Sequence, residues 1–320
     1  MPLYLGVDGG QSSTTALIGD ERGTVLGAGR GGPCNHVKGP EGRAKFIGAV
    51  RGCIESACRQ AALDPLRVRF EAACLGFSGG PADKEELLEK MINTERLMVT
   101  HDGLIALSGA TGGRPGIIVI AGTGSMAFGR NAAGRTARAG GWGYVFGDEG
   151  GAFDIVRQAL RATLRHEEGW GPATSLSALL LEATGARDAN DLMHRFYTTD
   201  YPRPKIAAYS RLVDQAAQDG DGVAGEVLKS AAQQLASYAA AARGQLFQEG
   251  DAVRIAHIGG VWRSGRVREY FRQILELDSD TSVGPPEYEP AAGALLEAYA
   301  SAGLAPSLSG LPAAEKERPL

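Results

Sequence analysis

Short apolar runs that pass through glycine-rich turns and then resume occur at two places in this chain. The run at residues 3–7 crosses such a turn and resumes at residues 14–18. The run at residues 117–120 does the same and resumes at residues 126–128. Apolar runs of this length, bounded by turn residues, predict strands, so each half of the chain is expected to open with a β-hairpin.

Strands and helices alternate after the first hairpin. A third strand is predicted at residues 24–28, and apolar residues at helical spacing predict helices at 41–61 and 82–92. One strand is predicted at 68–76, between these two helices, and another at 96–100, after the second helix. A further helix is predicted to start at Asp102. The order β-β-β-α-β-α-β-α predicts an open α/β sheet covered by helices.

The second half contains more helix. Residues 152–166 and most of 175–242 are predicted helical, a strand is predicted at 254–258, and helices follow at 266–277 and 291–302. The two hairpin turns are offset by 113 residues, the difference between Gly9 and Gly122. The sequence therefore predicts two related halves.

This organisation predicts two α/β domains. The first is expected to span residues 1–113 and to be completed by the helix at 291–302. The second is expected to span residues 114–290, with a helical insertion at about 170–245. Residues 304–320 contain several prolines and a charged end, which predict a disordered tail.

Both hairpin turns favour anion binding. They are too short and too rich in glycine to cover their backbone N–H groups, and such exposed donors bind phosphate. A P-loop or dinucleotide fold would send its glycine-rich turn into a helix, whereas both turns here lead into strands. Two phosphate hairpins on opposite walls of a cleft would suit a nucleoside triphosphate.

Composition excludes several classes of protein. The chain has 320 residues, 43% of them hydrophobic, which is enough for two cores. Its net charge of −4 argues against nucleic acid or an anionic membrane as partner. No apolar run approaches the roughly 20 residues of a membrane span, and the chain enters a strand without a leader, so we expect a cytoplasmic protein. The four cysteines show no metal-ligand spacing and are interpreted as buried apolar residues.

Two aspartates follow predicted strands. Asp8 stands directly before a glycine pair, where phosphates would repel a bare carboxylate unless a divalent cation lay between, so we expect it to orient hydrated Mg²⁺. Asp102 heads a helix, where a carboxylate could accept the proton of a sugar hydroxyl during phosphoryl transfer. The alternatives are a turn-capping role for Asp8 and a helix N-cap role for Asp102.

Two further segments are candidates for ligand contact. Residues 139–151 contain Asp148, Glu149 and Trp142, and sugars are bound by planar polar groups and aromatic faces. Trp142 could equally belong to the core. Gly259 and Gly260 follow a strand directly, which would allow close backbone approach to adenine or ribose.

Taken together, these motifs resemble those of N-acetylglucosamine kinases, within the BadF/BadG/BcrA/BcrD ATPase family and the wider actin, Hsp70 and sugar-kinase superfamily. The resemblance covers almost the whole chain in family order. It rests on eight blocks, which are GVDGG from Gly6, Asn35-His36, Ser78-Gly79-Gly80, Thr100-His101-Asp102, AGTGS from Ala121, GGWG from Gly140, GDEG from Gly147 and GGVW from Gly259.

The resemblance implies two actin-like (ribonuclease H-like) domains, with an ATP and sugar cleft between them and Asp102 as catalytic base. It implies a sugar site lined by Asn35, Ser78, Gly141, Trp142, Gly143 and Asp148. It implies nucleotide contacts from Gly10, Gln11, Ser12, Ser13, Gly122, Thr123, Gly124, Gly259 and Gly260, with Mg²⁺ at Asp8. Gln11 departs from the family, which usually has a small residue there. We also expect a homodimer.

The leading hypothesis is an ATP-dependent 6-kinase of an amino sugar, first of all N-acetylglucosamine, with glucosamine or N-acetylmuramic acid as alternatives. A different class within the family is the ATP-driven activator of acyl-CoA dehydratases or reductases, which holds an iron–sulfur cluster through cysteines. No cysteine pair lies at the expected positions late in this chain. A sugar-sensing transcription factor would need a DNA-binding domain in front, yet Tyr4 already lies in the first predicted strand.

Overall fold

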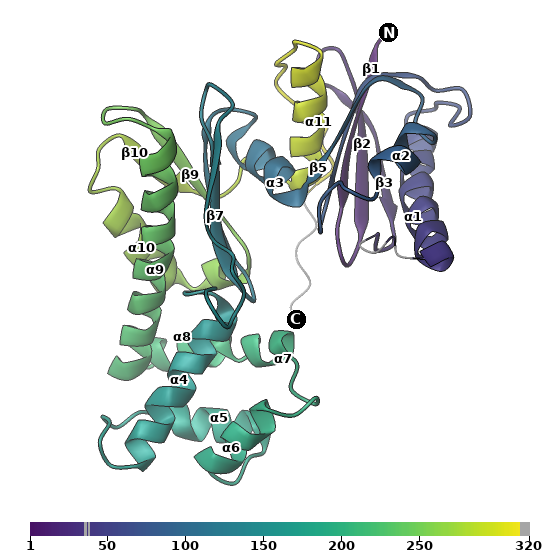
Figure 1. Cartoon of the computed structure of the whole chain (residues 1–320). Coiled ribbons are helices and arrows are strands. Elements are labelled where there is room, and N and C mark those ends of the chain that lie inside the picture. Colours follow the sequence, from purple (N-terminus) through teal and green to yellow (C-terminus); the bar gives the residue numbers. More distant parts are fainter. Residues whose placement is uncertain (35–36, 38, 314–320) are drawn as a thin grey trace. The chain divides into compact units, whose positions relative to one another are not determined.

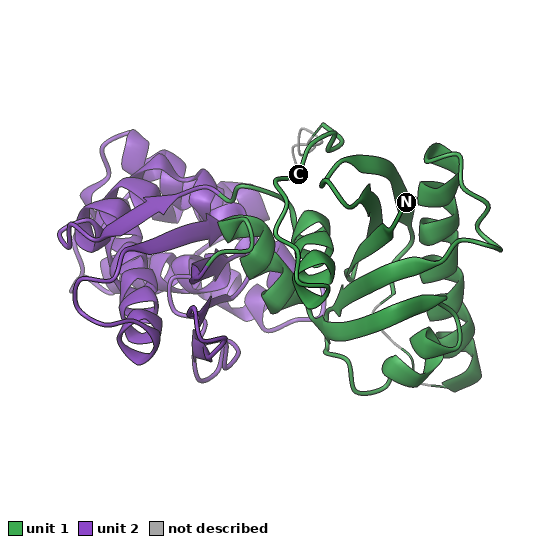
Figure 2. Cartoon of the chain, turned by 90° about the horizontal axis from the view of Figure 1, so that it is seen from above, with its two compact units in different colours: residues 1–114, 286–320 green, residues 115–285 purple. Residues whose placement is uncertain are grey.

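The computed structural model describes residues 1–34, 37 and 39–313. The chain forms two compact units, which Figure 2 shows in different colours. Unit 1 contains residues 1–114 and 286–320, and unit 2 contains residues 115–285. Each unit is built around one five-stranded mixed sheet.

The sheet of unit 1 has the strand order β3-β2-β1-β4-β5 (Figure 1). Its strands are β1 (Leu3–Gly9), β2 (Thr14–Asp20), β3 (Val25–Gly31), β4 (Phe70–Phe77) and β5 (Thr94–His101). The first three strands pair antiparallel, whereas β4 pairs parallel to β1 and β5 parallel to β4. The carboxyl ends of β1, β4 and β5 therefore meet at one edge of the sheet, where ligands bind in open α/β sheets.

Helices cover both faces of this sheet. They are α1 (Gly39–Gln60), α2 (Glu85–Glu89), α3 (Asp102–Thr111) and α11 (Pro290–Ser301). Leu5 and Val7 of β1 face the core under α1, and Tyr4 faces the core under α11, as the alternation of a strand requires. A Cβ added to Gly6 would lie 2.2 Å from the backbone nitrogen of Leu295. Only glycine therefore lets α11 pack this closely against β1.

The sheet of unit 2 has the order β10-β9-β6-β7-β8. Its strands are β6 (Gly116–Ala121), β7 (Ser125–Arg130), β8 (Thr136–Gly140), β9 (Val253–Ile258) and β10 (Thr281–Gly284). Strands β6, β7 and β8 pair antiparallel, while β9 pairs parallel to β6 and β10 parallel to β9. Unit 2 thus repeats the strand order of unit 1, with the hairpin again at the start.

The helices of unit 2 include a long insertion between β8 and β9 (Figure 1). They are α4 (Ala152–Glu167), α5 (Leu176–Thr184), α6 (Ala189–Phe196), α7 (Arg203–Ala207), α8 (Ser210–Gln218), α9 (Gly222–Leu246), the 3₁₀ helix η1 (Gly260–Arg263) and α10 (Gly265–Leu275). One apolar core joins the sheet to α4, α8, α9 and α10. Within residues 1–34, 37 and 39–313, no helix combines the length and apolar character that a membrane crossing needs.

Three expectations from the sequence need correction. Helix α2 is shorter than the predicted span of 82–92, because the residues before it form turns in which buried Lys84 donates to the Gly80 carbonyl at 2.8 Å. Strand β10 has only four residues and was not predicted. The expected disordered tail begins too early, because Leu304 and Leu308 pack against the core under α11 and the Val25 N–H donates to the Ser309 carbonyl at 2.9 Å. Residues 314–320 lie outside the described part.

Candidate active site

The sheet edge of unit 1 brings together two side chains predicted for the site. Gly9 of β1 is in register with Phe77 of β4, which in turn is in register with His101 of β5. Ser78 and Asp102 directly follow these last two strands. The Ser78 hydroxyl donates a hydrogen bond to Oδ2 of Asp102 at 2.8 Å. The structure therefore places Ser78 and Asp102 in direct contact.

Asp102 is the first residue of α3, but it is not the N-cap of that helix. The N-cap residue is His101, whose Nδ1 accepts from the Leu104 N–H at 3.2 Å. Asp102 remains exposed, and its Oδ1 accepts the N–H of the next residue, Gly103, at 2.9 Å. The alternative that Asp102 is the N-cap is thus wrong, because His101 caps the helix. An exposed carboxylate at a strand end can accept a proton from a bound hydroxyl.

Asp8 has no cation paired with it among residues 1–34, 37 and 39–313. Burial raises the pKa of its carboxyl to about 6, with smaller contributions from the nearby carboxylates of Asp102 and Glu289. Within the described part of the chain, Asp8 forms no hydrogen bond or ion pair. A bound cation would relieve the cost of its ionisation.

This arrangement fits a magnesium ion held mainly by other ligands. Among residues 1–34, 37 and 39–313, no group of three or more His, Cys, Asp or Glu side chains could hold a metal ion. Mg²⁺ in nucleotide sites usually keeps several waters and uses one or two carboxylates plus the substrate phosphates. The single carboxylate of Asp8 matches that pattern.

The first hairpin turn exposes a row of backbone donors. The Gly10 N–H donates to the Ser13 carbonyl at 2.9 Å, which closes the turn. Gln11, Ser12 and Ser13 are exposed, and their N–H groups have no partner among the described residues. Such a row of free donors forms an anion-binding concavity.

The second hairpin turn is held by a helix N-terminus. The Gly122 N–H donates to the Gly124 carbonyl at 2.9 Å. The carbonyls of Gly122 and Thr123 accept from the first N–H groups of α4, those of Ala152 at 2.8 Å and Phe153 at 3.2 Å. The N–H groups of Thr123 and Gly124 have no partner within the described residues. The turn is thus fixed by its carbonyls, which leaves its donors available.

Asp148 lies against this second hairpin. Its side chain is buried, and its backbone has a φ of 62°, a left-handed conformation that is costly for a residue other than glycine. Oδ1 accepts from the Ser125 N–H at 3.4 Å, and Oδ2 accepts from Nη2 of Arg203 at 3.1 Å. The structure thus shows contacts of Asp148 with the hairpin and with the insertion.

The loop after β8 presents aromatic side chains to solvent. Trp142 is 68% exposed, so the alternative that it belongs to the core is wrong. The guanidinium of Arg138 lies 4.7 Å from the centre of its ring. Phe146 is 83% exposed, which the sequence analysis did not anticipate. Gly141 has a φ of 73° and Gly143 a φ of 81°, so both provide the left-handed turns of this loop.

Gly259 has a structural reason to be glycine. Its φ is 115°, and an added Cβ would lie 2.4 Å from the Ala121 carbonyl oxygen. The end of β9 therefore packs directly against the start of the second hairpin turn. Gly260 has nothing within 4 Å of the position of an added Cβ. Gly260 thus leaves open space, whereas Gly259 serves packing.

One predicted site residue, Asn35, lies outside the described residues. The residue before it is tied to the first hairpin, because the Cys34 N–H donates to the Gly10 carbonyl at 3.3 Å. The buried hydroxyl of Thr14 donates to the Gly32 carbonyl at 2.7 Å and lies 3.1 Å from Sγ of Cys34. The loop after β3 is thus anchored to the phosphate hairpin up to Cys34.

The four cysteines are buried and free, as predicted. Burial raises the pKa of Cys53 to about 12 and also raises the pKa values of Cys34 and Cys58. All four lie in unit 1. Cluster ligation at a subunit interface needs accessible thiolates, so these buried thiols argue against the activator class.

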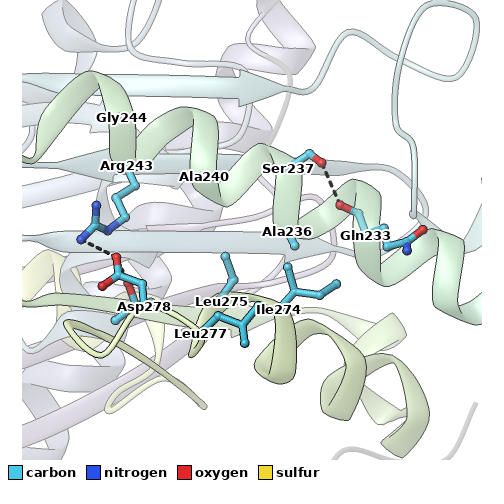
Figure 3. A pocket seen from close by; sticks show the side chains of 11 residues that line it. Gln233, Ala236, Ser237, Ala240, Arg243, Gly244, Ile274, Leu275, Leu277 and Asp278 are labelled. Carbon is cyan, nitrogen blue, oxygen red and sulfur yellow. Dashed lines mark hydrogen bonds and ion pairs between the residues drawn. The ribbon is translucent and has the colours of Figure 1, made fainter. Parts of the chain in front are cut away.

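A cavity of about 590 Å³ lies elsewhere, between α9 and α10 (Figure 3). Arg243 and Asp278 form an ion pair of 2.8 Å at one end of this cavity, and Ile274 and Leu277 form an apolar wall. None of the predicted site residues lines it. This cavity in unit 2 is therefore separate from the residues predicted for the site.

Comparison with known proteins identifies the class. The model of the BadF/BadG/BcrA/BcrD ATPase family matches residues 5–298. The chain therefore belongs to this family of ATPases, as the sequence motifs predicted.

Two relatives are named as kinases of amino sugars. An N-acetylmuramic acid/N-acetylglucosamine kinase from Clostridium acetobutylicum is 31% identical over 284 residues, which cover 87% of this chain and 92% of the relative. An N-acetyl-D-glucosamine kinase from Dictyostelium discoideum is 33% identical over 247 residues, covering 73% of this chain and 76% of the relative.

A solved structure from Chromobacterium violaceum, described as a proposed N-acetylglucosamine kinase, superimposes with a TM-score of 0.68. Its sequence is 29% identical, and the match covers 92% of this chain and 98% of that one. The predicted actin-like α/β fold class is thereby confirmed.

Proposed function

We propose that this chain is an ATP-dependent kinase that transfers the γ-phosphate to the 6-hydroxyl of an amino sugar, with N-acetylglucosamine as first candidate. The observation that carries this proposal is Asp102, an exposed carboxylate that accepts a hydrogen bond from Ser78 where the parallel strands β4 and β5 end. Membership in an ATPase family and relatives that are named as amino-sugar kinases support it.

The proposed chemistry assigns each group one task. The sugar hydroxyl would donate its proton to Asp102 as its oxygen attacks the γ-phosphorus and the bond to ADP breaks. Ser78 donates to Oδ2 of Asp102 and so fixes the orientation of the base. Magnesium, when bound, supplies charge neutralisation on the phosphates, and Asp8 would hold it through water.

The nucleotide phosphates are assigned to the two hairpin turns. The free N–H groups of Gln11, Ser12 and Ser13 in one turn, and of Thr123 and Gly124 in the other, are the donors proposed to bind them. Gly260, with open space beside it, is proposed to lie next to adenine or ribose.

The sugar is assigned to the loop after β8 and to the sheet edge. Trp142 offers an exposed aromatic face, and Gly141 and Gly143 shape the backbone around it. Ser78, Asp148 and Asn35 complete the proposed sugar-binding set. We further propose that the protein is a cytoplasmic homodimer. Multi-angle light scattering of the purified protein will measure its oligomeric state.

The test of the base assignment is Asp102→Asn. The amide keeps the shape of the carboxylate but cannot accept the proton, so kcat should fall by about a hundredfold or more with little change in sugar affinity. Asp188→Asn is the matched control, because Asp188 also starts a helix, accepting the Asp191 N–H at 2.7 Å. Its turnover should stay near that of wild type. If Asp102→Asn retained more than about a tenth of kcat, the base assignment would fall.

A further inference from the structure

A buried negative charge lies beside the second hairpin turn. Asp148 is only 7% exposed, and a Cβ added to Gly124 would lie 2.5 Å from its Oδ2. The same carboxylate accepts from the Ser125 N–H. The turn next to it is the one whose free N–H groups are proposed to bind ATP phosphates. An uncompensated carboxylate at this place would repel them, and burial strengthens such repulsion.

The guanidinium of Arg203 compensates this charge. Nη2 of Arg203 lies 3.1 Å from Oδ2 of Asp148. The other charged groups nearby have partners of their own, because Glu149 accepts from the Tyr238 hydroxyl and Asp154 pairs with Arg157 at 2.5 Å. Within the described residues, Arg203 is therefore the ion-pair partner of Asp148.

The position of Arg203 is fixed from several sides. Its guanidinium lies 4.4 Å from the ring centre of Tyr144 and 5.6 Å from that of Phe153. Pro202 is the N-cap of α7, and Pro204 occupies its first turn. Prolines restrict the backbone on both sides, so the side chain leaves a stiff segment. The insertion thus delivers a preorganised cation to the loop after β8.

We propose that Arg203 is a positioning residue of the nucleotide site. It cancels the charge of Asp148 beside the second hairpin, so that the turn can accept ATP phosphates. Arg203 acts through Asp148 and does not itself contact the substrate. The inference rests on the proposed function, and it assigns to the helical insertion a part in ATP binding that no sequence motif indicates.

The decisive variants separate charge from packing. Arg203→Gln should raise the Kd for a non-hydrolysable ATP analogue by about tenfold or more, because the carboxylate is left unpaired beside the phosphates. Arg203→Lys keeps the charge and should stay within about threefold of wild type. The double variant Arg203→Gln with Asp148→Asn carries neither charge and should recover most of the ATP affinity. A purely structural role for Arg203 predicts no such recovery.

Arg195→Gln is the matched control, because Arg195 pairs with Asp191 at 2.9 Å in the same insertion but away from the hairpin. Titration calorimetry on each full-length variant gives the Kd, and circular dichroism melting reports folding. The control should bind the analogue like wild type. If Arg203→Gln does not fold, Asp148→Asn alone decides, because it should bind ATP at least as tightly as wild type.

Three outcomes would each overturn the inference while the proposed function stands. One is an Arg203→Gln variant that binds the analogue like wild type. Another is a folded double variant that is as impaired as the single variant. The third is an Asp148→Asn variant with a raised Kd for the analogue. If the wild-type protein itself binds no ATP, the proposed function fails and the inference falls with it.

Discussion

Replacing Asp8 by asparagine should stabilise the free protein while it damages catalysis. The pKa of the Asp8 carboxyl is raised from its ordinary 3.8 to about 6, mainly by burial. One pKa unit corresponds to about 1.4 kcal/mol, so at about pH 8 the ionised carboxylate lowers the free energy of unfolding by up to about 3 kcal/mol. The amide must still be buried, so we expect a net gain of about 1–3 kcal/mol for Asp8→Asn.

The sign of the pH dependence follows from the raised pKa. The native state binds the Asp8 proton more tightly than the unfolded state, so this group favours folding at low pH and its contribution is lost as the pH rises through about 6. The advantage of Asp8→Asn should therefore be largest above about pH 7. It should fall to roughly half by about pH 5 and disappear near pH 4.

Urea unfolding of wild type and Asp8→Asn across this pH range measures the difference. Glu21→Gln is the matched control, because it makes the same change of acid to amide at an exposed position of unit 1. The control should show no comparable pH-dependent gain. A gain for Asp8→Asn that did not depend on pH, or a loss of stability at about pH 8, would refute the burial argument. Magnesium with ADP should stabilise wild type more than the variant, since Asp8 is the proposed metal-orienting group.

Two further substitutions test packing and sugar contact. Gly293→Ala should lower the melting temperature and the free energy of unfolding, the latter by more than about 2 kcal/mol, because the new Cβ would lie 1.9 Å from the Ile105 carbonyl oxygen. Gly244→Ala is the control: its new Cβ would have nothing within 4 Å, so the stability should be unchanged or slightly raised. Trp142→Ala should raise KM for the sugar without changing the melting temperature. Trp170→Ala is the control, because it removes a similarly exposed ring that also lies against an arginine, and it should change neither value.

Local patterns predicted most of the framework. The apolar runs around Gly9 and Gly122 predicted both hairpins, because strand and turn signals lie within a dozen residues of each other. The placement of Ser78 and Asp102 at one sheet edge also followed from the order of elements, since parallel strands end at the same edge.

Contacts between distant residues could not be predicted in the same way. Arg203 is 55 residues from Asp148 in sequence, and nothing in the Pro-Arg-Pro segment indicates which carboxylate it meets. The exposure of Trp142 was equally undetermined, because an aromatic residue in a glycine-rich loop can face either core or solvent. The packing of Leu304 and Leu308 was missed because proline-rich composition predicts disorder without regard to tertiary contacts.

The most direct test of the central claim is product analysis across a panel of sugars. Purified protein with ATP and magnesium should release ADP with N-acetylglucosamine, and to a lesser degree with glucosamine or N-acetylmuramic acid, and phosphorus–proton correlation NMR should place the phosphate on the 6-oxygen. Asp102→Asn should abolish both signals. The absence of sugar-dependent ADP release with every amino sugar, or a phosphate found on another oxygen, would contradict the account.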